Sequence, residues 1–139
     1  MAGMNERNGY VALVLVSHSA AIAEGVAELV SQVAGPDVSI LTAGGGPDGT
    51  LGTDGGRVLE ALRTASEGAG GVVLMDLGSS ILSVRAALGE LSSEQRERLA
   101  VVDAPLVEGA VAAGVTASTG ANRDETALAA TQARAAAKF

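Results

Sequence analysis

The stretch Val11-Ala12-Leu13-Val14-Leu15-Val16-Ser17-His18-Ser19 is the main indication of the fold. In it, an apolar run passes directly into three polar side chains. Val and Leu at this density are typical of a strand that is buried on both faces. The following residues repeat apolar side chains at helical spacing, at Ile22, Val26, Leu29, Val30 and Val33. Spacings of three, four and seven suit one face of a helix, and Ser19 is a natural N-cap for it. The stretch therefore predicts a core strand followed by a helix over residues 20–34.

His18 is the only histidine of the chain, and it lies where this strand passes into the helix. In an open parallel sheet, ligands bind at the carboxyl ends of the strands. The free N–H groups at a helix start favour an anion such as a phosphoryl group. Histidine is a nucleophile that can carry such a group. The position predicts a phosphoryl-binding histidine.

The composition excludes several classes of function. The chain has 139 residues, a formal net charge of -7, no Cys, no Trp, one Phe and one Tyr. The negative charge argues against binding to a nucleic-acid backbone, and the lack of aromatic residues leaves no platform for stacked bases. Without cysteine there is no disulfide, no thiolate nucleophile and no zinc site built on sulfur. We expect no metal and no cofactor.

The length and the apolar segments predict one cytoplasmic domain over residues 1–139. We expect residues 1–8 and the last few residues to be disordered. The apolar stretch after Arg7 is too short for a signal peptide, and no segment approaches the roughly 20 apolar residues of a membrane span. The sequence therefore predicts no membrane insertion.

Short apolar runs alternate with longer amphipathic ones, which is typical of strands joined by crossover helices. We predict an α/β fold with a doubly wound, mainly parallel open sheet of four or five strands and helices on both faces. The strands are expected near residues 10–17, 38–42, 72–76 and 99–102. Helices are expected over 20–34, from 53 or 54, from 78, and in two alanine-rich segments after Pro105 that divide near residues 120–122. The third helix should turn Ile81, Val84, Leu88 and Leu91 inward.

A second polar cluster, Asp76-Leu77-Gly78-Ser79-Ser80, ends the third strand. If the first and third strands lie side by side, Asp76 reaches His18 at the switch-point crevice. A carboxylate that accepts a hydrogen bond from one ring nitrogen fixes the tautomer and leaves the other nitrogen as the nucleophile. The alternative is that His18 only caps a helix and Asp76 is a turn residue. Two clusters on one sheet edge favour the functional interpretation.

Other motifs fit known chemistry less well. The glycine-rich residues 44–56 lack the Gly-Lys-Ser/Thr of a P-loop, a dinucleotide-binding turn and the spacing of a calcium loop. A lid over the crevice and a plain surface loop both remain open for this segment. A hydrolase triad of Ser79, His18 and Asp76 lacks a Gly-x-Ser-x-Gly elbow and an aromatic pocket.

Four stretches carry a family resemblance: Val-Ser-His-Ser at 16–19, Gly-Thr-Asp at 52–54, Met-Asp-Leu-Gly-Ser at 75–79 and Ala-Pro-Leu-Val-Glu-Gly at 104–109. Together they resemble the phosphocarrier subunit of the phosphoenolpyruvate-dependent dihydroxyacetone kinase, which is similar to the mannose-class IIA domain of the sugar phosphotransferase system. The resemblance runs from about residue 9 to residue 120, in order and in spacing.

The resemblance implies a histidine phosphorylated at Nε2, here His18, with Asp76 as its partner. It implies a homodimer, the small carrier protein of the phosphotransferase system as donor, and an ADP-holding subunit of the kinase as acceptor. Some relatives carry further carrier-protein and enzyme I-like domains after this one. Since the sequence here ends at Phe139, we expect the phosphate to come from separate proteins. Two alternatives remain: a IIA domain that serves a sugar transporter, and a non-enzymatic regulatory module that binds an anion or a partner.

The residues themselves agree with a carrier. Backbone N–H groups after Ser19 and around Gly78 and Ser79 are predicted to cradle the phosphate. Neither cluster contains a lysine or arginine, and neutral dipoles release a phosphate more readily than an arginine clamp. Arg57 and Arg85 are expected on solvated helix faces. The small side chains of residues 104–136 favour a dimer built away from the crevice, or helices that cover the sheet of their own chain.

Overall fold

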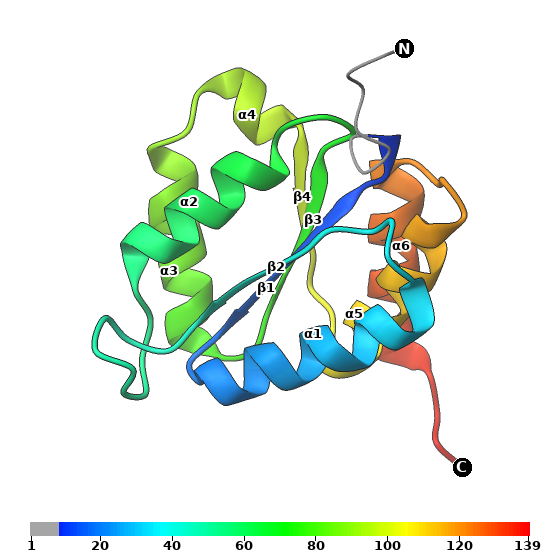
Figure 1. Ribbon diagram of the computed structural model, residues 1–139, viewed down its shortest axis with the longest axis horizontal. Helices are drawn as coiled ribbons and strands as arrows, with labels where there is room; N and C mark the ends of the chain where they lie inside the picture. The colour runs from blue at the N-terminus through cyan, green and yellow to red at the C-terminus, as the bar shows by residue number, and fades with distance from the viewer. Residues whose placement is uncertain (1–8) are drawn as a thin grey trace.

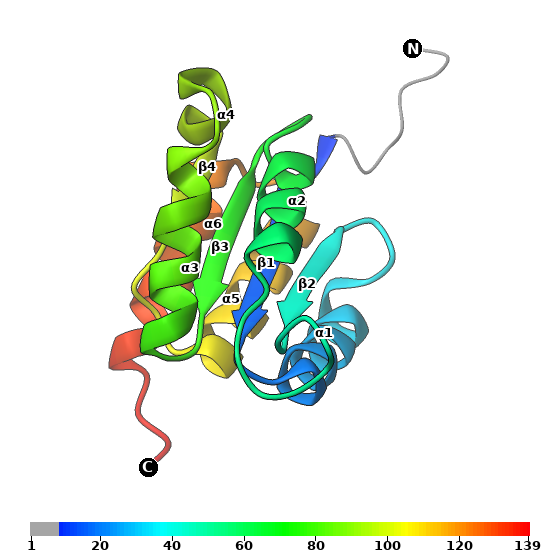
Figure 2. The ribbon, with the colours of Figure 1, turned by 90° about the vertical axis from the view of Figure 1, so that its left-hand side faces the viewer.

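The computed structural model describes residues 9–139, and its centre is a sheet of four parallel strands. The strands are β1 (Ala12–Ser17), β2 (Ile40–Gly44), β3 (Gly71–Met75) and β4 (Leu99–Val101). Their order across the sheet is β2-β1-β3-β4. Figure 2 shows β2, β1 and β3 side by side, with the long glycine-rich connection after β2 at their carboxyl ends. The predicted doubly wound parallel sheet is confirmed.

Strand β1 lies in the middle of the sheet, and every one of its residues is buried. Val16 is opposite Met75 of β3 on one side and Ala43 of β2 on the other. The predicted neighbourhood of the first and third strands is therefore confirmed. A central strand with two neighbours and two covered faces explains why its sequence is an unbroken apolar run.

Helices cover both faces of the sheet (Figure 1). They are α1 (Ala20–Ala34), α2 (Gly55–Ala65), α3 (Gly78–Gly89), α4 (Ser93–Glu97), α5 (Leu106–Ser118) and α6 (Arg123–Gln132). One core cluster joins α1, α5 and α6 to the side chains of Leu13, Leu15 and Leu74. The other joins α2 and α3 to Val14, Val16 and Val73 on the opposite face. The alternation of side chains along β1 thus supplies both cores.

Two local predictions differ from the structure. The second strand begins at Ile40 rather than at Val38, which packs into the core from the turn before it. In α3 and just after it, Val84, Leu88 and Leu91 pack into the core as predicted. Ile81 is 37% exposed instead, and Ser80 is fully buried in the first turn. Ser80 faces inward because its hydroxyl donates to the carboxylate of Asp76. The polar link before β4 also holds the short helix α4, which starts with a capping box of Ser92 and Gln95.

The small side chains of α5 serve packing within the chain. A Cβ on Gly114 would lie 2.5 Å from Val30 of α1, and one on Gly109 would lie 3.0 Å from Leu74 of β3. Both glycines therefore allow α5 to approach the sheet and α1 closely. The alternative that these helices cover their own sheet is correct for this face of α5. Val107, Val115 and Leu128 remain exposed on the outer sides of α5 and α6.

After α6 the chain forms a short 3-10 helix, η2 (Ala133–Ala135), and then a tail. Each of these two segments makes one ion pair. Arg134 lies 3.3 Å from Asp103, and Lys138 lies 3.7 Å from Glu108. The predicted disorder of the last residues stays a prediction, and that of residues 1–8 lies outside the described residues. Within residues 9–139, none of the helices has the length and apolar character needed to span a membrane.

Candidate active site

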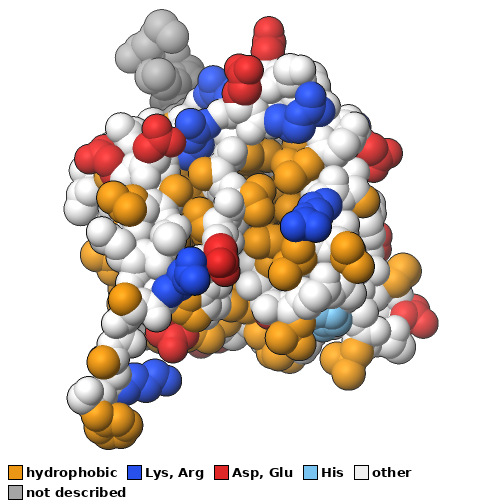
Figure 3. All heavy atoms as spheres, turned by 180° about the vertical axis from the view of Figure 1, so that it is seen from behind, with side chains coloured by type: hydrophobic (Ala, Val, Ile, Leu, Met, Phe, Trp, Pro, Cys, Tyr) orange, Lys and Arg blue, Asp and Glu red, His pale blue; other side chains and the backbone are white. Residues whose placement is uncertain are grey.

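His18 lies between the last residue of β1 and the N-cap of α1, as predicted. Ser19 adopts an extended backbone conformation, and its hydroxyl accepts a hydrogen bond from the N–H of Ile22 at 3.3 Å. The side chain of His18 is 26% exposed. Figure 3 shows the pale blue histidine at the surface of the molecule, next to hydrophobic side chains. The ring is thus accessible at the edge where the strands end.

Asp76 follows β3 directly and meets His18 across the boundary between the two strands. Its Oδ1 lies 3.0 Å from the ring nitrogen Nδ1 of His18. Its Oδ2 accepts a hydrogen bond from the main-chain N–H of His18 at 3.1 Å. The carboxylate therefore contacts both the ring and the backbone of the histidine. The structure brings together the two residues that the sequence analysis paired.

The electrostatics of Asp76 favour the ionised form. Burial of the carboxyl group acts to raise its pKa, but hydrogen bonds from Ser80, Ser17, His18 and the N–H of Leu77 outweigh burial and hold the pKa of Asp76 well below its usual range. An ionised carboxylate is only an acceptor, so the proton between it and the ring belongs to Nδ1. This leaves Nε2 of a neutral His18 with its lone pair.

The hydroxyl of Ser79 contacts Nε2 of His18, and it is a donor to that lone pair in this tautomer. Ser79 and Gly78 form the first turn of α3, whose N-terminus has no side-chain cap. Ser79, on this turn, contacts Nε2, and helix N–H groups without a side-chain acceptor are suited to an anion. Of the three residues predicted to cradle phosphate, Gly78 and Ser79 lie on this turn. The hydroxyl of Ser19 is engaged as the cap of α1, and its role toward phosphate stays a prediction.

The glycine-rich connection between β2 and α2 is hydrogen bonded to the histidine segment. The N–H of Gly45 donates to the carbonyl of Ser17 at 3.1 Å, and that of Gly52 donates to the carbonyl of His18 at 2.9 Å. Both glycines have positive φ, 82° and 136°, which side chains rarely adopt. The hydroxyls of Thr53 and Ser83 lie 2.6 Å apart and join the segment to α3. The segment thus forms a wall beside His18, bonded to it on one side and to α3 on the other.

Sequence reasoning missed two residues of the site, Ser17 and Ser80. Ser17 donates to Oδ2 of Asp76 at 2.7 Å, and Ser80 donates to Oδ1 at 2.6 Å. Both lie in the polar clusters that the sequence analysis singled out. No spacing in the sequence marks the role of either serine. Their roles become visible only in the folded chain, where both are buried and donate to Asp76.

Arg57 and Arg85 are both exposed, as predicted. Arg57 lies 3.7 Å from Asp54, the N-cap of α2, which it approaches from the first turn of that helix. Arg85 lines a groove between α3 and β4 with Met75 and Asp103. Neither guanidinium group is among the hydrogen-bond partners of His18 or Asp76 within residues 9–139. The contacts of the histidine therefore come from a carboxylate, hydroxyls and backbone groups.

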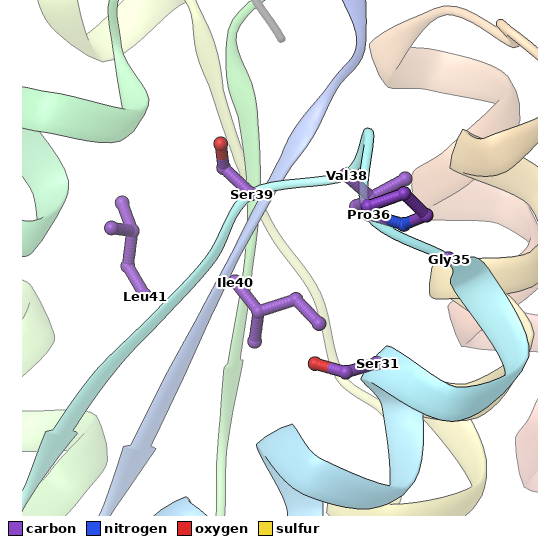
Figure 4. A pocket seen from close by; sticks show the side chains of 7 residues that line it. All are labelled: Ser31, Gly35, Pro36, Val38, Ser39, Ile40 and Leu41. Carbon is purple, nitrogen blue, oxygen red and sulfur yellow. The ribbon is translucent and has the colours of Figure 1, made fainter.

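A hollow of about 580 Å³ lies away from this site, beside the amino end of β2 (Figure 4). Its lining consists of Ser31, Gly35, Pro36, Val38, Ser39, Ile40 and Leu41. These side chains are apolar or carry hydroxyls, and none of them is a base or a charged group. His18 and Asp76 lie at the other end of the sheet, where β1 and β3 end.

Comparison with known proteins agrees with this arrangement. The model of the EIIA-man family, described as "PTS system fructose IIA component", matches residues 12–127. The match runs from the start of β1 into the first half of α6 and includes both His18 and Asp76. The chain therefore belongs to this family of IIA components of the phosphotransferase system.

Individual relatives indicate which members of this family the chain resembles. A protein of Listeria innocua named phosphoryl donor subunit DhaM of a PEP-dependent dihydroxyacetone kinase is 40% identical over 105 residues, which cover 76% of this chain and 84% of that protein. The DhaM subunit of Escherichia coli is 39% identical over 118 residues, 83% of this chain but only 25% of the longer relative. A crystal structure titled "unknown function protein EF1359" superposes with a TM-score of 0.79 at 34% identity, and the match covers 87% of this chain and 92% of that one. The resemblance to the dihydroxyacetone kinase phosphocarrier is confirmed.

Proposed function

We propose that the chain is a phosphohistidine carrier that receives a phosphoryl group at Nε2 of His18 and passes it to an ADP-holding subunit of dihydroxyacetone kinase. The observation that carries the proposal is the geometry of the ring. Nδ1 is bound by Asp76 at 3.0 Å, while Nε2 faces Ser79 on the uncapped first turn of α3. Membership in the IIA family and the names of the DhaM relatives support the same function.

The reaction needs an in-line attack and release of the phosphoryl group to a second protein. The lone pair of Nε2 forms the N–P bond while the bond to the donor breaks and its electron pair returns to the donor. The hydroxyl of Ser79 leaves Nε2 and turns toward the incoming phosphoryl oxygens. The N–H groups of Gly78 and Ser79 bind the same oxygens, and Asp76 stabilises the positive charge that the ring acquires.

A protein donor suits the surface around the histidine. Leu77 and Leu82 are each 65% exposed on the α3 side of the site, and Leu51 is 81% exposed in the glycine-rich wall. Exposed leucines near one reactive group are typical of a protein-docking surface. We propose that the small carrier protein of the phosphotransferase system and the acceptor subunit both dock here. The chain is then a phosphotransferase subunit, and the cytoplasmic location remains a prediction.

A homodimer is part of the proposal. Val107 and Val115 on α5 and Leu128 on α6 stay exposed, on helices that cover the face opposite α3. Pairing there leaves His18 accessible to its partners. Sedimentation equilibrium at micromolar concentration should give twice the mass of a 13.6 kDa chain. A single-chain mass contradicts the dimer.

The transfer itself tests the proposal. The protein is incubated with phosphoenolpyruvate, enzyme I and the small carrier protein, and then with the ADP-holding subunit and dihydroxyacetone. We expect dihydroxyacetone phosphate to form only when all components are present. Phosphate uptake without transfer to this acceptor favours a sugar-transporter IIA domain. Absence of uptake contradicts the carrier and favours a regulatory module.

The docking surface has a matched test. Leu77→Lys should slow phosphorylation by the carrier about tenfold or more, because a desolvated lysine opposes an apolar contact. Leu29→Lys, at a 44% exposed position on α1 outside both proposed surfaces, should leave the rate unchanged. Equal rates for both variants contradict docking at Leu77.

A further inference from the structure

The carboxylate of Asp76 has more hydrogen-bond donors than its contact with His18 requires. Oδ1 accepts from the hydroxyl of Ser80 at 2.6 Å, the N–H of Leu77 at 2.6 Å and Nδ1 of His18 at 3.0 Å. Oδ2 accepts from the hydroxyl of Ser17 at 2.7 Å and the N–H of His18 at 3.1 Å. These donors come from the ends of β1 and β3 and from α3. The carboxylate is therefore fixed in position and in orientation.

The two serines are the unusual members of this set. Ser17 and Ser80 are both completely buried, although most of the other buried side chains of this chain are apolar. A buried hydroxyl is destabilising unless it has a partner. Ser17 donates to Asp76 and accepts from the N–H of Ser19 at 3.0 Å, and Ser80 lies 3.2 Å from Nδ1 of His18 as well. Asp76 is the acceptor for both hydroxyl protons.

We propose that Ser17 and Ser80 are positioning residues that hold Asp76 as an ionised acceptor, so that His18 keeps its proton on Nδ1 and its lone pair on Nε2. Neither hydroxyl is bonded to Nε2, the atom that reacts in the proposed function, and both act through the carboxylate. The inference rests on the proposed function only for the identity of that atom.

The balance of charge explains why the donors matter. When Nε2 forms a bond to phosphorus, the proton on Nδ1 stays, and the ring becomes positive beside a negative Asp76. A carboxylate with fewer donors is more basic and takes a larger share of that proton. A ring that loses the proton is neutral and is a poorer leaving group from phosphorus. The hydroxyls thus keep the phosphohistidine ready for transfer, and the low pKa of Asp76 agrees with this role.

The single histidine makes the test direct, because the ring nitrogens of His18 are the only imidazole signals of the chain. The ¹⁵N chemical shifts of the ring, recorded at alkaline pH in the full chain, report which nitrogen carries the proton. We expect Nδ1 protonated and Nε2 unprotonated in the unaltered protein. Ser17→Ala and Ser80→Ala should each raise the share of the Nε2–H tautomer, because the carboxylate is then no longer held where it accepts the Nδ1 proton. The double variant should raise this share most.

Ser66→Ala is the matched control. Ser66 is buried too, at 4% exposure, but its hydroxyl donates to the carbonyl of Arg63 at the end of α2. This variant loses a buried hydroxyl without touching Asp76, so the tautomer of His18 should not change. Far-UV circular dichroism confirms that each variant is folded. Because Ser17 and Ser80 lie on different elements, one variant still tests the inference if the other does not fold.

Phosphorylation by the carrier gives the second readout. The rate should fall about 10- to 100-fold in Ser17→Ala and in Ser80→Ala, the range found when a second-layer hydrogen-bond partner is removed, and it should stay constant in Ser66→Ala. Unchanged ring shifts in both serine variants overturn the inference, as does an Nε2–H tautomer in the unaltered protein. Shifted tautomers in a protein that accepts no phosphate support the inference and refute the proposed function.

Discussion

Asp76 contacts His18 at two points, through the ring nitrogen Nδ1 at 3.0 Å and through the main-chain N–H at 3.1 Å. The two residues follow neighbouring strands, β1 and β3, at the same edge of the sheet. The backbone contact fixes the start of the turn, and the ring contact fixes the direction of the imidazole. A change at Asp76 should therefore act on the orientation of the imidazole as well as on its charge.

Asp76→Asn tests this orientation while it preserves the shape of the side chain. We expect phosphorylation of His18 to fall about 10- to 100-fold, because the amide has one acceptor atom where the carboxylate has two. Samples are taken at intervals during transfer from the carrier protein and stopped with alkali. Mass measurement of the phosphorylated fraction in each sample gives the rate. A rate equal to that of the unaltered protein contradicts the role of Asp76.

The pH dependence of stability gives an independent test of Asp76. Its pKa is lower in the folded chain than in the unfolded chain, so the stabilisation is present above about pH 4 and is lost as the pH falls toward the folded value. Between about pH 5 and about pH 3, the free energy of unfolding should fall more steeply in the unaltered protein than in Asp76→Asn. Urea unfolding across this range measures both slopes. Glu67→Gln, which removes one charge from an exposed position, should keep the steeper slope.

The bond between Thr53 and Ser83 should hold the glycine-rich wall against α3. In Thr53→Val the hydroxyl pair is lost, and the amide of Gly52, which donates to the carbonyl of His18, should exchange its hydrogen up to about tenfold faster. Thr50→Val removes an exposed hydroxyl that bonds only to Asp48, and it serves as the control. Equal exchange rates at Gly52 in all three proteins contradict the role of this bond.

Glycine at position 44 is required by the close approach of β2 to the start of α1. A Cβ there would lie 2.8 Å from the Cα of Ala20 and 2.8 Å from the carbonyl oxygen of Ser19, so Gly44→Ala should destabilise the fold by about 1–3 kcal/mol. Gly25→Ala, on the exposed side of α1 where a Cβ has no neighbour within 4 Å, should stabilise it by about 0.5–1 kcal/mol. Chemical unfolding of both variants distinguishes the two effects by their sign.

The pairing of His18 with Asp76 was predictable because two general rules lead to it. Apolar runs identify parallel strands, and right-handed crossovers allow the first and third strands to be neighbours, so polar residues that follow them meet at one edge. The bounds of α1 were predictable from local signals at its two ends. Ser19 is the N-cap, and Gly35 ends the helix with a positive φ.

The roles of the two buried serines and the exposure of Ile81 were not predictable from the same patterns. Periodicity assigned Ile81 to the core because it is apolar, whereas Ser80 occupies the inner side of the first turn to reach Asp76. A polar residue faces inward only where it has a hydrogen-bond partner. Asp76 lies only four residues before Ser80, but the other buried serine, Ser17, reaches the same carboxylate across 59 residues of sequence. The contact of Gly52 with the carbonyl of His18 likewise depends on two segments far apart in the sequence. Such contacts follow from the tertiary fold and have no local signal.

Phosphorylation of the unaltered protein and of His18→Ala tests the central claim most directly. Both proteins are incubated with phosphoenolpyruvate, enzyme I and the small carrier protein, and their masses are measured at alkaline pH, with far-UV circular dichroism to confirm that the variant is folded. We expect one phosphoryl group on the unaltered protein, lost on acid treatment, and none on His18→Ala. Equal phosphorylation of the two proteins would show that the phosphoryl group is carried elsewhere and would contradict the account.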